Sequence, residues 1–412
     1  MQWLDGKFWA MCRGMTVSAA VTVTGGGGTA VAHASDHLDT PTVITNPRAD
    51  IGDLFAWMSQ DGRQLNLAMT IVGHSFSPEV DYIFHVDSGS RFGATTATTL
   101  ITCHFAAANA VTCGAGNSDI ARGDASKPDG LQGKRRRMRV FAGMRDDPFF
   151  NNVRGTRAAY EVAARELQHG AKMDEAGCLA FDAKTAQEIF HQWRHTEGGP
   201  ATDLLSGWTP ASLIVTVDLE VVAKGGKALA VWAATVAPEG QLDRAGRPLT
   251  GNALLGTIAA RNISDQLKEQ YNAATPSTAS QFIPEIEKAL GLYDSFDGQC
   301  GNQLLADAKA PPANKYRTLA ALLADDRLWV NGESAVCTQL FAVELANLAG
   351  HDELRNDCGG RAPTYSAVNT YRSLLVSGVS VGVDDGLVRD DHEQSATQFP
   401  FLAPPGPVSS ER

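Results

Sequence analysis

The sequence predicts an α+β fold, with an antiparallel β-sandwich-like or barrel-like core and a helical layer towards the C-terminus. Two observations carry this prediction. Apolar residues alternate with polar ones through much of residues 64–224, which is typical of strands that bury one face. Beyond residue 249, apolar residues recur every three or four positions, which is typical of amphipathic helices.

The β-rich part is expected to cover residues 35–248. Turns rich in Gly, Ser and Asp separate its segments, and such turns favour antiparallel strands over a parallel nucleotide-binding sheet. Two helical inserts are expected, at 156–168 and 183–193. The alternation predicts strands at 65–71, 80–86, 98–105, 138–142, 213–221 and 228–237.

The helical part is expected to cover residues 249–376. Apolar stripes at helical spacing predict helices at 263–271, 282–290, 319–323 and 336–343, and Pro311-Pro312 marks a break between the second and third. An acidic loop and a C-terminal segment follow at 377–403. Residues 35–403 are thus expected to form a single large domain, with a disordered Pro- and Ser-containing tail at 404–412.

The first 34 residues have the features of a signal peptide. Lys7 and Arg13 precede an uncharged stretch at 15–32 that ends in the small-x-small triplet 32–34. The stretch is short and broken by four glycines, whereas a spanning helix needs about 20 mainly apolar residues. We therefore expect cleavage before Ser35, a mature form without a membrane span, and a periplasmic or extracellular location.

Charge and cysteine content agree with export. The formal net charge of −11 becomes −12 once a leader with two basic residues and one acidic residue is removed, which argues against a nucleic-acid partner. Six cysteines then remain, and an even number fits disulfides in an oxidising compartment. Cys103 and Cys113 flank a predicted hairpin and are expected to pair. The pairing of the other four is left open.

Several strings along the chain resemble a known family. They are S-D-H-L-D-T-P at 35–41, A-D-I-G-D-L-F-A-W at 49–57, F-A-G-M-R-D-D-P-F-F at 141–150, D-R-A-G-R-P-L at 243–249 and F-P-F-L-A-P at 399–404. Together they resemble the bacterial secreted family of domain of unknown function 4331, over nearly the whole mature chain. The resemblance implies no reaction. Relatives often carry a calcium-loop-like turn after the strand that matches 84–87, but S-G-S-R-F-G follows here, which disfavours calcium at that turn.

The acidic loop near the C-terminus is the first candidate metal site. Its carboxylates offer enough oxygen ligands for calcium, although their spacing is not that of an EF-hand, and a solvated acidic turn is the alternative interpretation. The candidate ligands are Asp384, Asp385, Asp390, Asp391 and Glu393.

The N-terminal region offers two further candidates. Cleavage before Ser35 would bring a free amine, two backbone amides and the His37 imidazole together, a donor set that suits copper(II) or nickel(II). An ordinary hydrogen-bonded His37 is the alternative. Asp50 and Asp53 lie three residues apart, where they either cap a turn or bind a hard cation.

The leading functional hypothesis is an exported, non-catalytic binding or structural protein that binds a divalent cation, calcium or copper, and an unidentified small ligand or protein. Arg145, Asp146 and Asp147 are expected to have a structural role on a loop after a strand. The alternative is a secreted enzyme of unknown class that gathers these three residues with the N-terminal carboxylates and His37 in one cleft. The sequence has no nucleophile elbow, P-loop or dinucleotide-binding glycine pattern.

Overall fold

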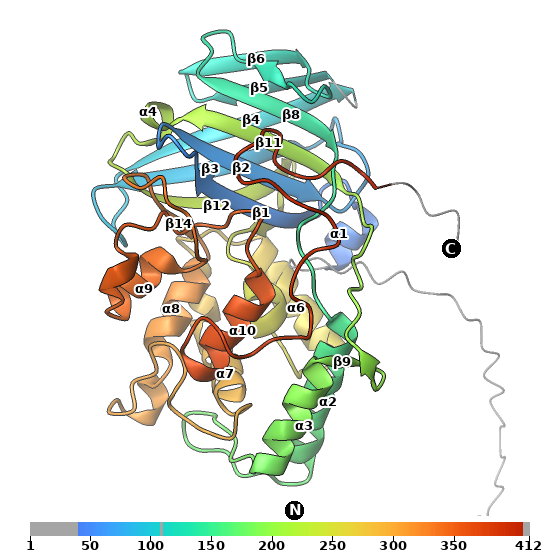
Figure 1. Ribbon diagram of the computed structural model, residues 1–412, viewed down its shortest axis with the longest axis vertical. Helices are drawn as coiled ribbons and strands as arrows, with labels where there is room; N and C mark the ends of the chain where they lie inside the picture. The colour runs from blue at the N-terminus through green and yellow to red at the C-terminus, as the bar shows by residue number, and fades with distance from the viewer. Residues whose placement is uncertain (1–39, 108–109, 407–412) are drawn as a thin grey trace, which may run out of the picture. The chain divides into compact units, whose positions relative to one another are not determined.

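The computed structural model describes residues 40–107 and 110–406. Two antiparallel sheets form its β part (Figure 1). The first sheet has the order β1 (Ile51–Met58), β2 (Gln64–Ile71), β11 (Ala211–Asp218), β8 (Met138–Met144) and β7 (Leu131–Gln132). The second has the order β13 (Gly240–Ala245), β12 (Ala228–Ala237), β3 (Asp81–Gly89), β4 (Ala97–Ala107), β5 (Ala110–Ala115) and β6 (Asp119–Asp124), and β14 (Leu328–Asn331) also pairs with β12. A two-stranded hairpin of β9 (His195–Thr196) and β10 (Gly199–Pro200) stands apart.

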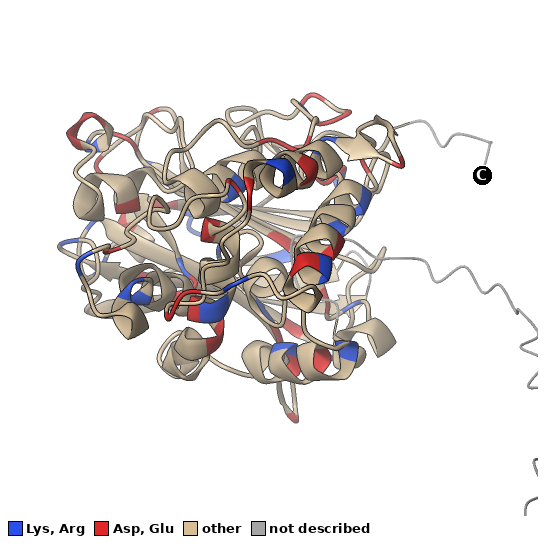
Figure 2. Cartoon of the chain, turned by 90° about the horizontal axis from the view of Figure 1, so that it is seen from below, with Lys and Arg blue, Asp and Glu red and all other residues tan. Residues whose placement is uncertain are grey.

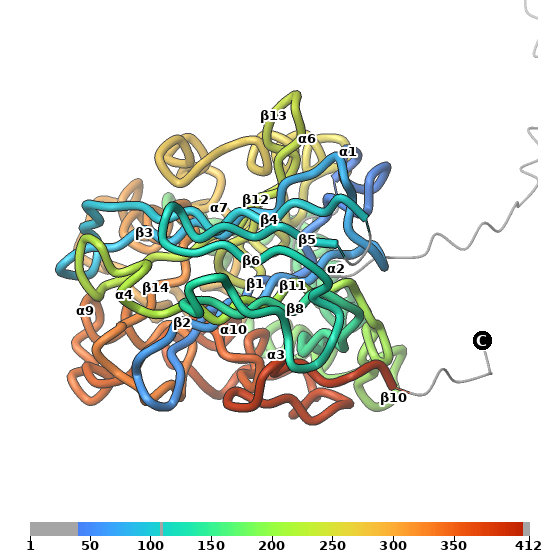
Figure 3. Tube along the Cα trace, turned by 90° about the horizontal axis from the view of Figure 1, so that it is seen from above, coloured from blue at the N-terminus to red at the C-terminus, as the bar shows by residue number. Residues whose placement is uncertain are grey.

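The two sheets pack on each other as a sandwich. Strand β1 contacts β12, β13 and β14 at one side of the interface, and β8 contacts β5 and β6 at the other. Seen from above, β4, β5 and β6 form a layer beside β8 and β11 (Figure 3). Side chains from both sheets belong to one continuous apolar core. The predicted sandwich-like α+β architecture is therefore confirmed.

Strands β1, β2 and β11 of the first sheet are buried on both faces, not on one as the alternation predicted. Every residue of β1 is buried, whereas β4 alternates between buried and exposed positions. The C-terminal segment, residues 379–406, provides part of the second cover (Figure 1). Trp57 of β1 donates its indole N–H to the Ala396 carbonyl at 2.8 Å and packs edge-on against Phe401, with ring centroids 4.9 Å apart.

The helices lie mainly on the side of the sheets opposite β5 and β6 (Figure 1). Helix α7 packs against both α8 and α10, and α2 packs against α3. Acidic and basic residues are interspersed along the helices seen from below (Figure 2). The helices are α1 (Pro41–Thr45), α2 (Val153–Gln168), α3 (Ala183–Trp193), α4 (Leu219–Val222), α5 (Thr250–Leu254), α6 (Arg261–Asn272), α7 (Ile283–Asp294), α8 (Arg317–Asp325), α9 (Ala342–Leu348) and α10 (Ala367–Ser377), with short 3₁₀ turns η1 (Ala279–Phe282), η2 (Pro312–Asn314) and η3 (Asp352–Leu354). No helix in the described ranges is long and apolar enough to cross a bilayer.

Two local predictions were wrong. The expected helix at 336–343 begins only at Ala342, because the Val336 carbonyl accepts a bond from the Cys358 amide at 2.6 Å and a disulfide joins Cys337 to Cys358. These cross-links hold the preceding residues outside a helix. The expected strand at 213–221 ends at Asp218, where the chain turns into α4 and the Leu219 amide bonds the Arg63 carbonyl.

Three disulfides cross-link the described residues. The expected Cys103–Cys113 bond joins the neighbouring strands β4 and β5. The two pairs that the sequence left open are Cys178–Cys300 and Cys337–Cys358. The expected leader at 1–34 and residues 407–412 of the expected tail lie outside the described residues.

Candidate metal site

The candidate site begins with Asp146, two residues beyond the end of β8. The Arg145 amide donates to the Pro210 carbonyl at 3.2 Å, and the Asp146 amide donates to the Ala403 carbonyl at 3.0 Å. These bonds tie the strand end to the start of β11 and to the C-terminal segment. Asp146 is only 1% exposed, so its carboxylate faces the protein interior and not solvent.

Gln394 joins Asp146 to the acidic loop. Its side-chain amide nitrogen lies 2.6 Å from one carboxylate oxygen of Asp146 and 2.6 Å from one of Asp390. The amide oxygen of Gln394 accepts a hydrogen bond from the Ala403 N–H at 2.8 Å, which fixes the orientation of the amide. One glutamine thus holds together two carboxyl groups that lie far apart in the sequence.

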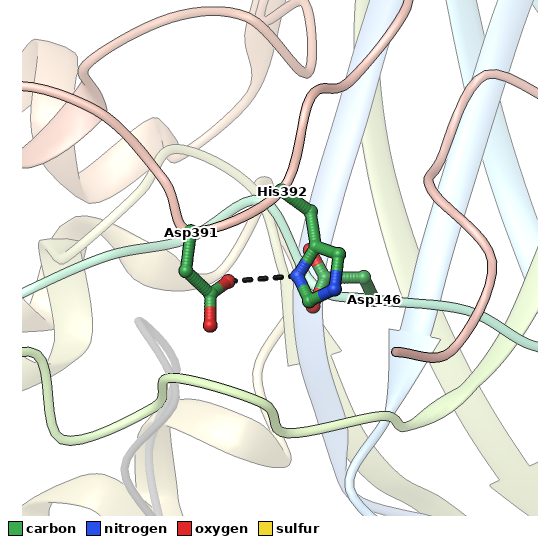
Figure 4. A group of neighbouring side chains, drawn as sticks. All are labelled: Asp146, Asp391 and His392. Carbon is green, nitrogen blue, oxygen red and sulfur yellow. Dashed lines mark hydrogen bonds and ion pairs between the residues drawn. The ribbon is translucent and has the colours of Figure 1, made fainter. Parts of the chain in front are cut away.

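His392 and Asp391 complete the cluster (Figure 4). The Nδ1 atom of His392 lies 3.1 Å from a carboxylate oxygen of Asp146 and 2.9 Å from one of Asp391. The second oxygen of Asp391 accepts bonds from the Ser206 hydroxyl at 2.6 Å and the Gly207 amide at 2.9 Å. One ligand atom each from Asp146, Asp391 and His392 therefore lies within 4.8 Å of the other two, a spacing at which the three can share one metal ion.

The electrostatics of the cluster are those of crowded carboxylates. Burial, with the nearby Asp390 charge, raises the pKa of Asp146 to about 8. Burial also raises the pKa of Asp390. Burial opposes ionisation of Asp391 too, but hydrogen bonds from Ser206 and His392 outweigh it and lower the pKa of that carboxyl group. The hydrogen bond to Asp391 raises the pKa of His392. Near neutral pH, the cluster therefore keeps protons on some of its groups. A bound cation would supply the positive charge that these protons provide.

The other acidic-loop candidates lie outside the cluster. Asp384 pairs with Arg194 at 3.2 Å. Asp385 is fully buried, accepts the Asn152 amide at 2.9 Å and faces Arg372 at 3.5 Å. Glu393 is exposed. Of the five carboxylates proposed from the loop, the structure gathers Asp390 and Asp391.

Asp53 and Asp147 lie in a separate buried network. Asp53 forms an ion pair with Arg361, and both side chains are at most 2% exposed. Asp147 accepts bonds from the Thr70 hydroxyl at 2.6 Å and the Phe149 amide at 3.2 Å. Burial, reinforced by the Asp53 charge, raises the pKa of Asp147. Asp50 is also buried.

Among the described residues, those expected to form one enzyme cleft do not line a common cavity. Arg145 lines a cavity whose other lining residues include neither Asp146 nor Asp147. Asp53 and Asp147 are engaged in buried bonds, as described above. The copper hypothesis at His37 lies outside the described residues.

The link between Asp146 and the acidic loop has no local signature in the sequence. Gln394 is 248 positions from Asp146, and no local spacing connects the two. His392 stands within the acidic loop, so its position in the sequence did carry a signal. Searches of family models, curated proteins and solved structures find no match to this chain, so its function is inferred from its own geometry.

Proposed function

We propose that this protein is an exported, non-catalytic binding protein that holds a divalent cation between β8 and the C-terminal segment. Asp146, Asp391 and His392 would ligate the ion, with Asp390 as a further carboxylate beside them. The observation that carries the proposal is the convergence of a nearly fully buried carboxylate with a second carboxylate and an imidazole, within 4.8 Å.

The donor set points to a particular class of ion. Calcium takes six to eight oxygen ligands, and the loop alone suggested calcium because five carboxylates crowd it. Asp384 and Asp385 are engaged elsewhere and Glu393 is exposed. Fewer carboxylate oxygens therefore remain, and an imidazole nitrogen joins them. A mixed set of carboxylate oxygens and one imidazole favours Zn²⁺ or Mn²⁺ over Ca²⁺.

The charge balance supports the same conclusion. The His392 imidazole contacts the carboxyl groups of Asp146 and Asp391, and Gln394 links Asp146 to the Asp390 carboxyl group. Asp146 is screened from water by the chain around it. Burying a carboxylate beside a like charge is unfavourable unless a proton or a cation compensates. A divalent ion would replace the proton that His392 Nδ1 shares with the two aspartates and would allow Asp146 to ionise.

The proposal also covers where the protein acts. Three disulfides within the described residues suit an oxidising environment, and the sequence-based leader would deliver the chain to the periplasm or the cell exterior. Membership in the family of domain of unknown function 4331 belongs to the same proposal, supported by the strings quoted above. In the periplasm or outside the cell, the cation would cross-link the C-terminal segment to the end of β8.

Isothermal titration calorimetry of chelator-treated, dialysed protein tests the metal site. We expect one-to-one binding of Zn²⁺ or Mn²⁺ that Asp146→Asn and Asp391→Asn each weaken by about tenfold or more, equivalent to about 1.4 kcal/mol. Asp384→Asn is the matched control, because Asp384 lies on the same loop but pairs with Arg194. Equal affinity in all four proteins, or no saturable binding of either ion, would overturn the proposal.

A further inference from the structure

A cavity lies near the end of β8, and its lining includes no residue of the acidic cluster. Its volume is about 340 Å³, at the lower end of the range of about 300–1,000 Å³ that is usual for small-molecule sites. Strand β8, the start of β11, the turn after β2 and the residues after β6 form its walls. The lining residues are His74, Ser75, Phe76, Ser126, Phe141, Gly143, Met144, Arg145 and Ala211.

Arg145 distinguishes this cavity from an ordinary surface hollow. The residue is 8% exposed, and its Nε atom has no hydrogen-bond partner. No acidic residue lines the cavity, and within residues 40–107 and 110–406 no carboxylate or carbonyl accepts a bond from this guanidinium. Burial lowers the pKa of Arg145, although the group stays charged at neutral pH because its usual pKa exceeds 12.

The other buried arginines differ from Arg145, because each of them is paired with a carboxylate. In the described part of the chain, four further arginines are buried, and each lies against a carboxylate. An isolated buried charge is costly, which is why native proteins pair it. The pairs are Arg244 with Asp326 at 3.7 Å, Arg247 with Glu344 at 2.9 Å, Arg361 with Asp53, and Arg372 with Asp385 at 3.5 Å.

The local sequence holds the guanidinium in a fixed position. Phe141, Gly143 and Arg145 follow the two-residue period of an extended chain, so all three fall on one face. The guanidinium carbon of Arg145 lies 4.4 Å from the centroid of the Phe141 ring. A Cβ atom on Gly143 would lie 3.0 Å from the tip of that ring. Glycine therefore leaves room for the phenylalanine ring and the arginine to stack along the strand.

The remaining lining residues supply polar groups at the edge and apolar walls. His74 bonds the Thr209 carbonyl through Nδ1 at 2.9 Å, which leaves Nε2 available to a ligand. The Ser75 hydroxyl forms no hydrogen bond within the described ranges. Phe76 and Met144 add apolar surface. The cavity thus combines one pre-positioned cation, neutral hydrogen-bonding groups and aromatic walls.

We propose that this cavity binds a small organic carboxylate, with the carboxylate on Arg145 and an apolar chain or ring against Phe76 and Phe141. Arginine presents a planar set of donors that matches a carboxylate in two-point contact. The apolar walls favour a carboxylate with a hydrocarbon part over inorganic phosphate. This site is independent of the cation site, because Arg145 and Asp146 face different surroundings.

Ligand-observed NMR and calorimetry with benzoate and hexanoate as probes test the proposal. The experiments contain a chelator, so that loss of the cation site does not affect the outcome. We expect saturable binding of at least one carboxylate, and binding of its neutral amide, benzamide or hexanamide, weaker by about tenfold or more. Saturable binding of inorganic phosphate with none of either carboxylate would overturn the assignment of the ligand class.

Two variants separate a binding role from a structural one. Arg145→Met should weaken carboxylate binding by about tenfold or more, and Arg145→Lys should retain part of it. Arg139→Met is the matched control, since Arg139 also belongs to β8 and stacks on a phenylalanine, Phe399, at 4.1 Å, but does not line the cavity. Unchanged affinity in folded Arg145→Met, equal binding of the amides, or no carboxylate binding up to ~10 mM would each refute the site.

Discussion

The stability of the metal-free protein should depend on pH through Asp146. Burial and the Asp390 charge raise the pKa of Asp146 to about 8, whereas an aspartate in the unfolded chain has a pKa of about 3.9. The folded state therefore binds this proton more tightly. Between these two pKa values, the free energy of unfolding falls as pH rises, by up to about 1.4 kcal/mol per pH unit.

The magnitude follows from the same values. From pH 5 to pH 8, one such carboxyl group accounts for a loss of at most about 4 kcal/mol. His392 acts in the same direction, because its hydrogen bond to Asp391 raises its pKa. The stability that His392 contributes is fully present below the pKa of an unfolded histidine, about 6.5. It is lost as pH rises through the higher pKa of His392 in the folded protein.

Asp146→Asn isolates this effect. Asparagine keeps the shape and can accept the Gln394 bond, but it does not ionise. We expect the variant to exceed the wild type in unfolding free energy at pH 8 by roughly 2–4 kcal/mol, with a flatter dependence on pH. Urea unfolding from pH 5 to pH 8 with a chelator measures this, and Asp384→Asn should behave as wild type. Parallel pH profiles for wild type and Asp146→Asn would refute the reasoning.

Three further outcomes follow from buried charges and cross-links. Arg145→Met should raise the unfolding free energy of the ligand-free protein by about 1–2 kcal/mol in urea titrations, because it removes an unpaired buried charge; a loss of similar size would indicate a structural role. Arg361→Met should cost about 3–5 kcal/mol in the same assay, since it removes the guanidinium from buried Asp53. Replacing Cys178 and Cys300 by serine should lower the unfolding free energy by about 2–5 kcal/mol. The loss should exceed that from replacing Cys103 and Cys113, because the β4–β5 disulfide closes a much shorter loop.

Much of the fold could be predicted because its periodicity is local. The helical insert expected at 183–193 matches α3, and the strand expected at 228–237 matches β12. Alternation also located β2, but it could not show that both faces of that strand are buried. On the neighbouring strand β1, part of the cover comes from residues more than 300 positions away, such as Phe401 against Trp57.

The candidate site was predicted only in part, for a related reason. The acidic loop was visible as a run of carboxylates, yet the run does not reveal which of them turn inward. Asp390 and Asp391 face Asp146, whereas Asp384 faces Arg194. That choice is made by long-range packing, in which Gln394 bonds both Asp146 and the Ala403 amide.

The string from Phe141 to Asp147 explains why neighbouring charges here do not form one catalytic group. Arg145 lies against Phe141 in the cavity, and Asp146 faces His392 and the acidic loop. Asp147 accepts the hydroxyl of Thr70, a residue of β2. An extended chain directs Asp146 to the side opposite Arg145. Asp147 lies beyond the end of β8 and is held by its own bonds to Thr70 and Phe149, so the three adjacent charges enter three separate environments. The motif therefore serves as a junction between a candidate anion cavity, a candidate cation site and a buried structural network, and each can be altered by its own substitution.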